Sequence, residues 1–215
     1  ENILSYMNEW GDHRFTATGV YSWQNYMYET LSISGNGFAN DETGSWDMGQ
    51  ANRETVEYGS DKYENSLISW TGRVTYAYKD RYLLTATARY DGSSRFGENN
   101  KWGFFPSIGL AWRASEEKFL AGNKVITNLK VRGSFGVTGN QEIGNYKSLA
   151  QLKVDNYIYN DTEIQGFYET IGNPDLKWER ANQFDIGIDL SLWNRIHVTA
   201  DYYHRKTSDL LYNVP

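Results

Sequence analysis

The chain of 215 residues has no cysteine, three prolines and three histidines. Without cysteine it can form neither a disulfide framework nor a zinc site built on thiolates. Purely apolar runs never exceed three residues, whereas a membrane-spanning helix needs about 20 mostly apolar residues, so a helical membrane protein is excluded. The net charge of −6, with no basic cluster to oppose it, argues against a nucleic-acid partner.

Aromatic side chains are abundant: the chain has 17 Tyr, 9 Phe and 8 Trp, or 16% of all residues. Disordered chains are poor in such residues, so we expect a folded protein. The mean hydropathy is nevertheless low, at −0.67. Many rings in a chain of low hydropathy suit strands that are polar on one face and aromatic on the other.

Apolar and polar residues alternate with a period of two, which predicts strands. Within 82–91, for example, Tyr82, Leu84 and Ala86 lie on one face, and Thr85 and Thr87 lie on the other. The pattern recurs in 14–24, 67–78, 104–113, 129–138, 183–192 and 196–205, and more weakly in 2–9. We therefore expect an all-β protein of about seven or eight antiparallel, up-and-down strands.

Four of the apolar stripes begin and end with a ring, namely Phe15 to Trp23, Trp70 to Tyr78, Tyr82 to Tyr90 and Phe104 to Trp112. Each spans about 26 Å at the usual strand rise, close to the ~25 Å apolar band of an outer-membrane barrel with its aromatic girdles. A soluble antiparallel sandwich also alternates and remains the alternative. It gives no reason for rings at both ends, so the pattern favours transmembrane barrel strands.

The connections between these segments alternate in length, which places long loops on one rim and short turns on the other, as in membrane barrels. The long connections are 30–63, 94–102 and 140–178. The short ones are 11–12, 79–81, 193–195 and the middling 115–127, which has one predicted helical turn at 115–120.

The polar face of the predicted strands carries charged residues. An Arg or Lys near the bilayer midplane costs about 2–4 kcal/mol, so this face must meet water or protein, as in a barrel lumen. A small barrel would pair these charges internally, and a wider one would hold a plug or a water-filled path; the sequence leaves both open. The predicted lumen-facing charges are Arg73, Arg89, Arg113, Arg132, Asp185, Asp189 and Asp201.

The long connections carry aromatic residues that are candidates for a binding site. Such rings can stack on sugars, seat a protein lid or simply pack the loops against one another, and all three readings stay open. The candidates are Trp46, Tyr58, Trp102, Tyr146 and Tyr159. The acidic segment 40–47 offers oxygen ligands for calcium but lacks EF-hand spacing, so a solvated loop is preferred.

No catalytic set is visible in the sequence, and no histidine pair has metal-ligand spacing. We therefore expect neither an enzyme nor a bound cofactor. From the residues alone, two functions compete: a component of a transport barrel, and a small autonomous barrel or soluble sandwich that acts as an adhesin or binding module.

Several motifs resemble those of the SusC/RagA family of TonB-linked outer-membrane proteins of Bacteroidota. The first is DRYLLTATARYDGSSRFG at 80–97, followed by NKWGFFPS at 100–107 and AWRASEE at 111–117. LKVRGSFGVTGNQ at 129–141 and NPDLKWE at 173–179 are similar too. Together these motifs cover most of the chain and are highly specific.

The resemblance implies a 22-stranded outer-membrane barrel with an amino-terminal plug and a TonB-contacting segment. It also implies import of oligosaccharide or peptide fragments, energy supplied through TonB and a SusD-like lipoprotein at the extracellular mouth. The chain starts without an initiator methionine or signal segment. We expect residues 1–215 to be one partial barrel domain that lacks the plug and leaves the substrate unidentified.

Overall fold

The computed structural model describes residues 1–40, 42 and 44–212. The chain divides into two compact units. One comprises Glu1–Gln24 and Leu67–Pro215, and the other comprises Asn25–Ser66. No helix among the described residues is long and apolar enough to cross a membrane.

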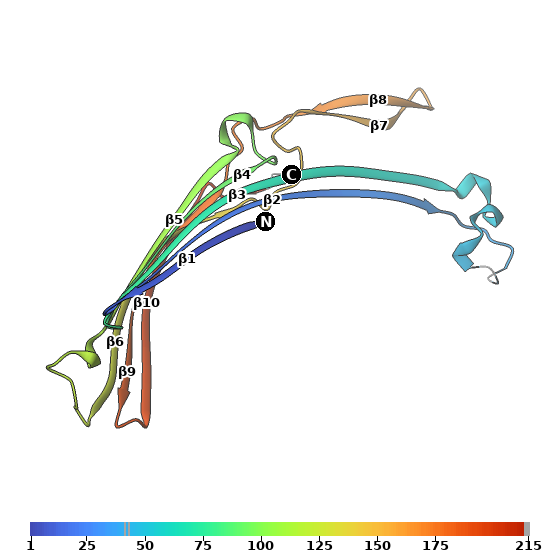
Figure 1. Cartoon of the computed structure of the whole chain (residues 1–215). Helices are drawn as coiled ribbons and strands as arrows, with labels where there is room; N and C mark the ends of the chain where they lie inside the picture. Colours follow the sequence, from blue (N-terminus) through green and yellow to red (C-terminus); the bar gives the residue numbers. More distant parts are fainter. Residues whose placement is uncertain (41, 43, 213–215) are drawn as a thin grey trace. The chain divides into compact units, whose positions relative to one another are not determined.

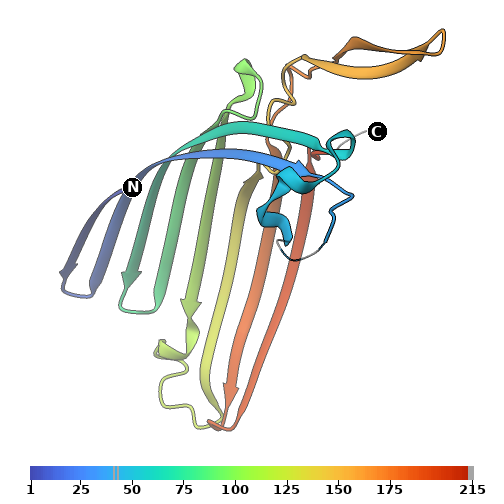
Figure 2. The same ribbon diagram turned by 90° about the vertical axis from the view of Figure 1, so that its right-hand side faces the viewer.

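An eight-stranded sheet dominates the structure, in the order β1-β2-β3-β4-β5-β6-β9-β10 (Figures 1 and 2). Every strand lies beside the next one along the chain, except that β9 follows β6 directly in the sheet. The strands are β1 (Asn2–Trp10), β2 (His13–Ser34), β3 (Glu57–Tyr78), β4 (Tyr82–Ser93), β5 (Trp102–Arg113), β6 (Ile126–Asn140), β9 (Glu179–Leu192) and β10 (Ile196–Ser208). This arrangement confirms the predicted antiparallel, up-and-down class, including the weaker strand at 2–9.

Two predicted connections contain more strand than expected. The connection 140–178 includes a hairpin of β7 (Gln151–Tyr159) and β8 (Thr162–Thr170), which forms a separate two-stranded sheet. The connection 30–63 shrinks to 35–56, because β2 and β3 are 22 residues long. The prediction was wrong here because these extensions carry exposed apolar side chains on both faces, so their sequences lack the alternation of apolar and polar residues that predicts a strand.

The Asn25–Ser66 unit holds the outer halves of β2 and β3 and three short 3-10 turns, η1 (Gly44–Trp46), η2 (Met48–Gln50) and η3 (Arg53–Thr55). Tyr28 and Tyr63 stack across the two strands with ring centroids 4.8 Å apart. The Asn52 side chain caps η3 by accepting a hydrogen bond from the Glu54 amide. Within this unit the two strand segments form a ribbon, and the three turns close its end.

The strand register gathers the apolar stripes onto one face. In an antiparallel pair, directly opposed residues lie on the same face. Val74 lies opposite Ala86, and Ala86 lies opposite Ile108. On the same face, but in the strands nearer the other edge of the sheet, Val131 lies opposite Ile188, and Ile188 lies opposite Ala200. We call this continuous surface the apolar face and the opposite surface the polar face.

Aromatic rings form a row at each end of the apolar face, as the stripes predicted. At the short-turn end, Trp10 stacks on His13 and His13 contacts Tyr78, with centroids 5.6 and 4.7 Å apart. At the long-connection end, Tyr21 contacts Trp70 at 4.5 Å. The apolar face is thus bounded by rings on both sides, which is typical of a membrane barrel wall.

The short connections are tight turns, as predicted. In Lys79-Asp80 and Trp193-Asn194 both residues have positive φ, between 50° and 54°, and a two-residue turn of this kind matches the twist of its strands. The helical turn predicted at 115–120 is a 3-10 turn, η5 (Ala114–Glu116), that continues into hydrogen-bonded turns. All four short connections emerge at the same end of the sheet (Figure 2).

The register can be tested with cysteines, because the chain has none of its own. Thr75 lies directly opposite Thr85, and opposed Cα atoms in such pairs are about 4.5–5.5 Å apart, within disulfide range. We expect the folded full-length protein with T75C and T85C to form this disulfide, measured by loss of free thiols. The control with T75C and A86C places the thiols on opposite faces and should stay reduced; a disulfide there would contradict the register.

Candidate functional site

All seven predicted charges lie on the polar face. Register places Arg132 opposite Gly187, and Asp201 opposite the same glycine from the other side. Asp189 lies opposite Lys130 and Thr199. The strands β6, β9 and β10 therefore concentrate acidic and basic groups on adjacent positions of one surface.

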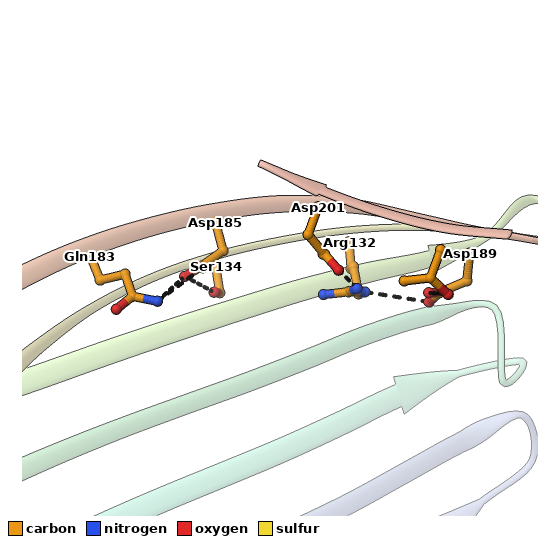
Figure 3. Close-up of polar contacts among 7 residues, drawn as sticks. Arg132, Ser134, Gln183, Asp185, Asp189 and Asp201 are labelled. Carbon is orange, nitrogen blue, oxygen red and sulfur yellow. Dashed lines mark hydrogen bonds and ion pairs between the residues drawn. The ribbon is translucent and has the colours of Figure 1, made fainter. Parts of the chain in front are cut away.

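Arg132 is the centre of this cluster and binds two carboxylates. Its Nε lies 3.3 Å from Asp189 Oδ2, and its Nη2 lies 2.6 Å from Asp201 Oδ1 (Figure 3). A Cβ on Gly187 would overlap Asp201 Oδ1 and lie 2.7 Å from Arg132 Cζ. Glycine at 187 thus leaves the space through which the guanidinium of β6 reaches the carboxylate of β10.

A second polar group lies along the same strands. Asp185 accepts hydrogen bonds from Ser134 Oγ at 3.3 Å and from Gln183 Nε2 at 3.0 Å (Figure 3). Beside it is an open pocket of about 290 Å³. Its polar lining comes from Thr85, Lys130, Arg132, Ser134 and Asp185. This pocket offers both signs of charge to a polar segment or solute that lies against the face.

The other predicted charges are satisfied more locally. Arg89 binds Asp91 on its own strand at 2.7 Å and donates to Ser69 Oγ at 3.2 Å. Arg113 binds Glu116 at 3.2 Å. Arg73 makes no hydrogen bond or ion pair within the described part of the chain. The polar face therefore pairs some of its charges internally and leaves others available.

A carboxylate also organises the short-turn rim. Glu117, in the 115–127 connection, accepts hydrogen bonds from Tyr82 Oη at 2.6 Å and Trp112 Nε1 at 3.3 Å, and Arg81 Nη1 lies 3.4 Å away. The hydrogen bond from Tyr82, followed by that from Trp112, lowers the pKa of Glu117 below its ordinary value. Glu117 therefore stays ionised and ties this connection to two rings of the girdle.

The five candidate aromatics have different environments. Trp102 stacks on Tyr90 with centroids 4.9 Å apart and is 46% exposed. Tyr58 belongs to strand β3, which corrects its assignment to a loop, because β3 starts at Glu57. Trp46 and Tyr159 are exposed, the former at 95%. Tyr146 has a positive φ of 60° in the segment before β7.

The residues that sequence reasoning missed form a junction between two connections. Arg95 donates from Nη1 to the carbonyls of Gln141 and Ile143, both at 3.2 Å. The amide of Gly97 donates to the carbonyl of Leu176 at 3.3 Å. We call Arg95–Gly97 together with 141–143 and 174–178 the loop junction. It holds both ends of the segment that carries the β7–β8 hairpin.

An aromatic cluster fills the loop junction. Phe96 is 1% exposed and lies 5.0 Å from Trp178, which lies 5.2 Å from Phe105. The Trp178 ring also donates to the carbonyl of Lys101 at 3.0 Å. Val137 completes the buried cluster, although its parity placed it on the apolar stripe. Pairing of β5 with β6 ends at Ser107 and Gly136, whereas β6 stays paired with β9 as far as Asn140.

Two sequence signals could have revealed the junction. Phe96 and Trp178 are large rings outside the period-two stripes, and each lies in a motif that carried the family resemblance. Pairs of aromatic rings are favourable beyond the apolar area that they bury. The two rings form such a pair with each other, across 82 residues of sequence separation.

Metal binding finds no support in the described residues, among which no group of three or more His, Asp or Glu side chains could hold an ion. The acidic segment 40–47, considered for calcium but predicted to be a solvated loop, includes Asp41 and Thr43, which lie outside the described residues. Within the rest of that segment, Asp47 accepts a hydrogen bond from Gln50 at 2.8 Å.

Comparison with known sequences gives strong matches over the whole chain. A family profile described as "TonB dependent receptor-like, beta-barrel" matches residues 2–215. TonB-dependent receptors P39 and P3 of Formosa agariphila are 41% and 38% identical to the chain, over all of it. TonB-dependent receptor SusC of Bacteroides thetaiotaomicron is 40% identical over 75% of the chain. The chain spans about a fifth of these relatives, between 16% and 22% of their lengths.

Solved structures give the same result. The structure of the RagAB peptide transporter matches 99% of the chain with a TM-score of 0.86 and 29% identity. The RagAB peptide importer in its "open-open" state matches with a TM-score of 0.84 and 30% identity. These matches cover 24% and 23% of the RagAB chains, respectively.

The loop junction predicts a strong effect at Gly97, where a Cβ would overlap the carbonyl oxygen of Pro174. We expect G97A in the full-length protein to destabilise the junction by about 1–3 kcal/mol, as overpacking does. Limited proteolysis within 141–178 should become faster. The control G109A places its Cβ 3.9 Å from the nearest atom, on Ser134, and should behave like wild type; equal cleavage in all three proteins would contradict the junction.

Proposed function

The chain belongs to the TonB-dependent receptor-like β-barrel family, and on this premise we propose that it forms part of the wall and extracellular mouth of an importer for oligosaccharide or peptide fragments. Its family consists of transporters rather than enzymes, and its strands belong to an outer-membrane β-barrel. The resemblance to SusC/RagA proteins is therefore confirmed. One observation above all supports the proposed role: the sheet has an uncovered apolar face and a charged face.

We assign the polar face to the lumen and the apolar face to the lipid. Charged side chains such as Arg132 and Asp189 are unfavourable in hydrocarbon, so they must face water or protein. The pocket beside Asp185 then lies on the transport path or against a plug domain. Arg73, without a partner in the described residues, is available to such a domain.

We assign the long connections to the extracellular side, because outer-membrane barrels have short periplasmic turns and longer extracellular loops. On this assignment the loop junction and the β7–β8 hairpin belong to the mouth. The turns at 11–12, 79–81 and 193–195 belong to the periplasmic rim. TonB would act from that side, through a part of the parent protein that precedes the barrel.

The β7–β8 hairpin is the element we assign to a SusD-like lid. An isolated two-stranded hairpin is only marginally stable in water, so contact with a partner would stabilise it. One face of this hairpin exposes Leu152, Val154, Ile158 and Phe167, with Ile158 at 78%. Val154 lies directly opposite Phe167. A protein lid that covers this strip would bury apolar area of the kind found at interface cores.

We assign substrate capture to exposed aromatic residues at the mouth. Trp46, Tyr58 and Tyr159 present open rings, which can stack on a sugar ring or on peptide side chains. Trp102 is engaged with Tyr90 and has a packing role instead. The peptide named for RagAB supports a peptide substrate, and the family resemblance adds oligosaccharides as the second substrate class to compare.

Sidedness can be tested with three matched substitutions, because Asn99, Asn160 and Asn194 are all exposed. In the full-length receptor, N99C and N160C should react with an impermeant maleimide on intact cells. N194C should react only after the outer membrane is permeabilised. Labelling of N194C alone on intact cells would show that the topology is the reverse of the one proposed. The hairpin would then not lie at the extracellular mouth.

The lid assignment predicts the effect of V154S with F167S. Loss of the apolar pair should reduce co-purification of a SusD-like partner several-fold. Cells should also grow more slowly on the oligosaccharide or oligopeptide that the receptor imports. The control N156S changes a polar residue on the same face and should leave both unchanged. Undiminished co-purification by the double variant would show that the lid binds elsewhere.

A further inference from the structure

An open groove of about 540 Å³ crosses the apolar face near its long-connection end. Its lining residues come from strands β1 to β5 and all lie in the unit that comprises Glu1–Gln24 and Leu67–Pro215. Almost all of its lining is carbon. The lining side chains that shape it are Leu4, Tyr21, Trp70, Ala88, Tyr90 and Phe104.

The floor of the groove is made of residues with little or no side chain. Gly19 lies opposite Leu4, and Gly72 lies opposite Ala88. A Cβ built on Gly19 or Gly72 would have no other atom within 4 Å. This openness differs from Gly187 on the polar face, whose space is filled by charged side chains. The protein itself therefore leaves the groove empty.

One wall of the groove is a row of rings, two residues along each strand from the floor. Trp70 lies opposite Tyr90, and Tyr90 lies opposite Phe104. The Tyr21 ring contacts Trp70 at 4.5 Å and continues the row toward β1. The wall is thus tall and continuous, whereas the floor lies at the level of the backbone.

We propose that this groove binds a fatty acyl chain of an outer-membrane lipid, in the leaflet on the long-connection side. The chain is part of an outer-membrane barrel, so its uncovered apolar face borders hydrocarbon. An unfilled groove would lose dispersion contacts along its whole lining. A flexible, unbranched alkyl chain fits a narrow trough that offers no charged partner.

The groove distinguishes this acyl chain from lipid that merely surrounds the barrel. Elsewhere on the apolar face, β9 presents Phe184, Ile186, Ile188 and Leu190 with no small residue between them. A lipid chain there rests on side-chain tips and exchanges freely. In the groove it contacts rings along one side and backbone beneath, which increases the number of contacts per methylene group.

The test uses the full-length receptor in phosphatidylethanolamine vesicles that contain a trace of the same lipid with a diazirine in one acyl chain. After irradiation, mass spectrometry compares adducts in peptides from 67–90 with those from 183–192. We expect adducts in 67–90 to be several-fold more frequent. G72L, which fills the floor without a clash, should reduce them several-fold, and G19L should do the same.

G133L is the matched control. Gly133 also lies on the apolar face, opposite Leu110 and Ile186, and its Cβ would be 3.7 Å from the nearest atom. It should assemble as wild type and keep the wild-type adduct pattern. Equal labelling of 67–90 and 183–192 in the wild-type receptor would overturn the proposal, whatever the variants do. Undiminished labelling in correctly assembled G72L would overturn it as well.

Discussion

The strand register is the constraint on which the rest of the structure depends. Because opposed residues share a face, a slip of one residue would transfer a strand's whole charged set to the apolar side. For β6 this would move both Lys130 and Arg132, at a cost of about 2–4 kcal/mol each near the bilayer midplane. Each neighbouring strand would meet a similar penalty, so the correct pairing is strongly selected across the sheet.

Glycine has opposite uses on the two faces. At Gly187 the missing side chain lets Arg132 reach carboxylates on two other strands, and at Gly97 it lets two connections approach closely. In both places the space is filled by other parts of the chain. At Gly19 and Gly72, on the apolar face, the space stays open. The same residue type therefore supports internal packing in one setting and shapes an external surface in the other.

The sequence predicts the sheet well because the membrane imposes a one-sided pattern. The stripe from Tyr82 to Tyr90 could be assigned to one face residue by residue, and its register partners agree. The pattern disappears in β7 and β8, both of whose faces are exposed. Tyr58 was misplaced in a loop for this reason. The Phe96–Trp178 contact was also beyond prediction, because it joins distant segments and follows no periodicity.

Because β6 pairs directly with β9, the strand pairing of the wall does not depend on the length or content of the segment between these two strands. Thr138 lies opposite Ala181, and Asn140 lies opposite Glu179, so the ladder closes as though residues 141–178 were absent. The wall's strand number and stagger are therefore independent of what this segment contains. The hairpin can therefore be lengthened, shortened or replaced without a change in the strand pairing of the sheet, provided that its two ends still fit the loop junction.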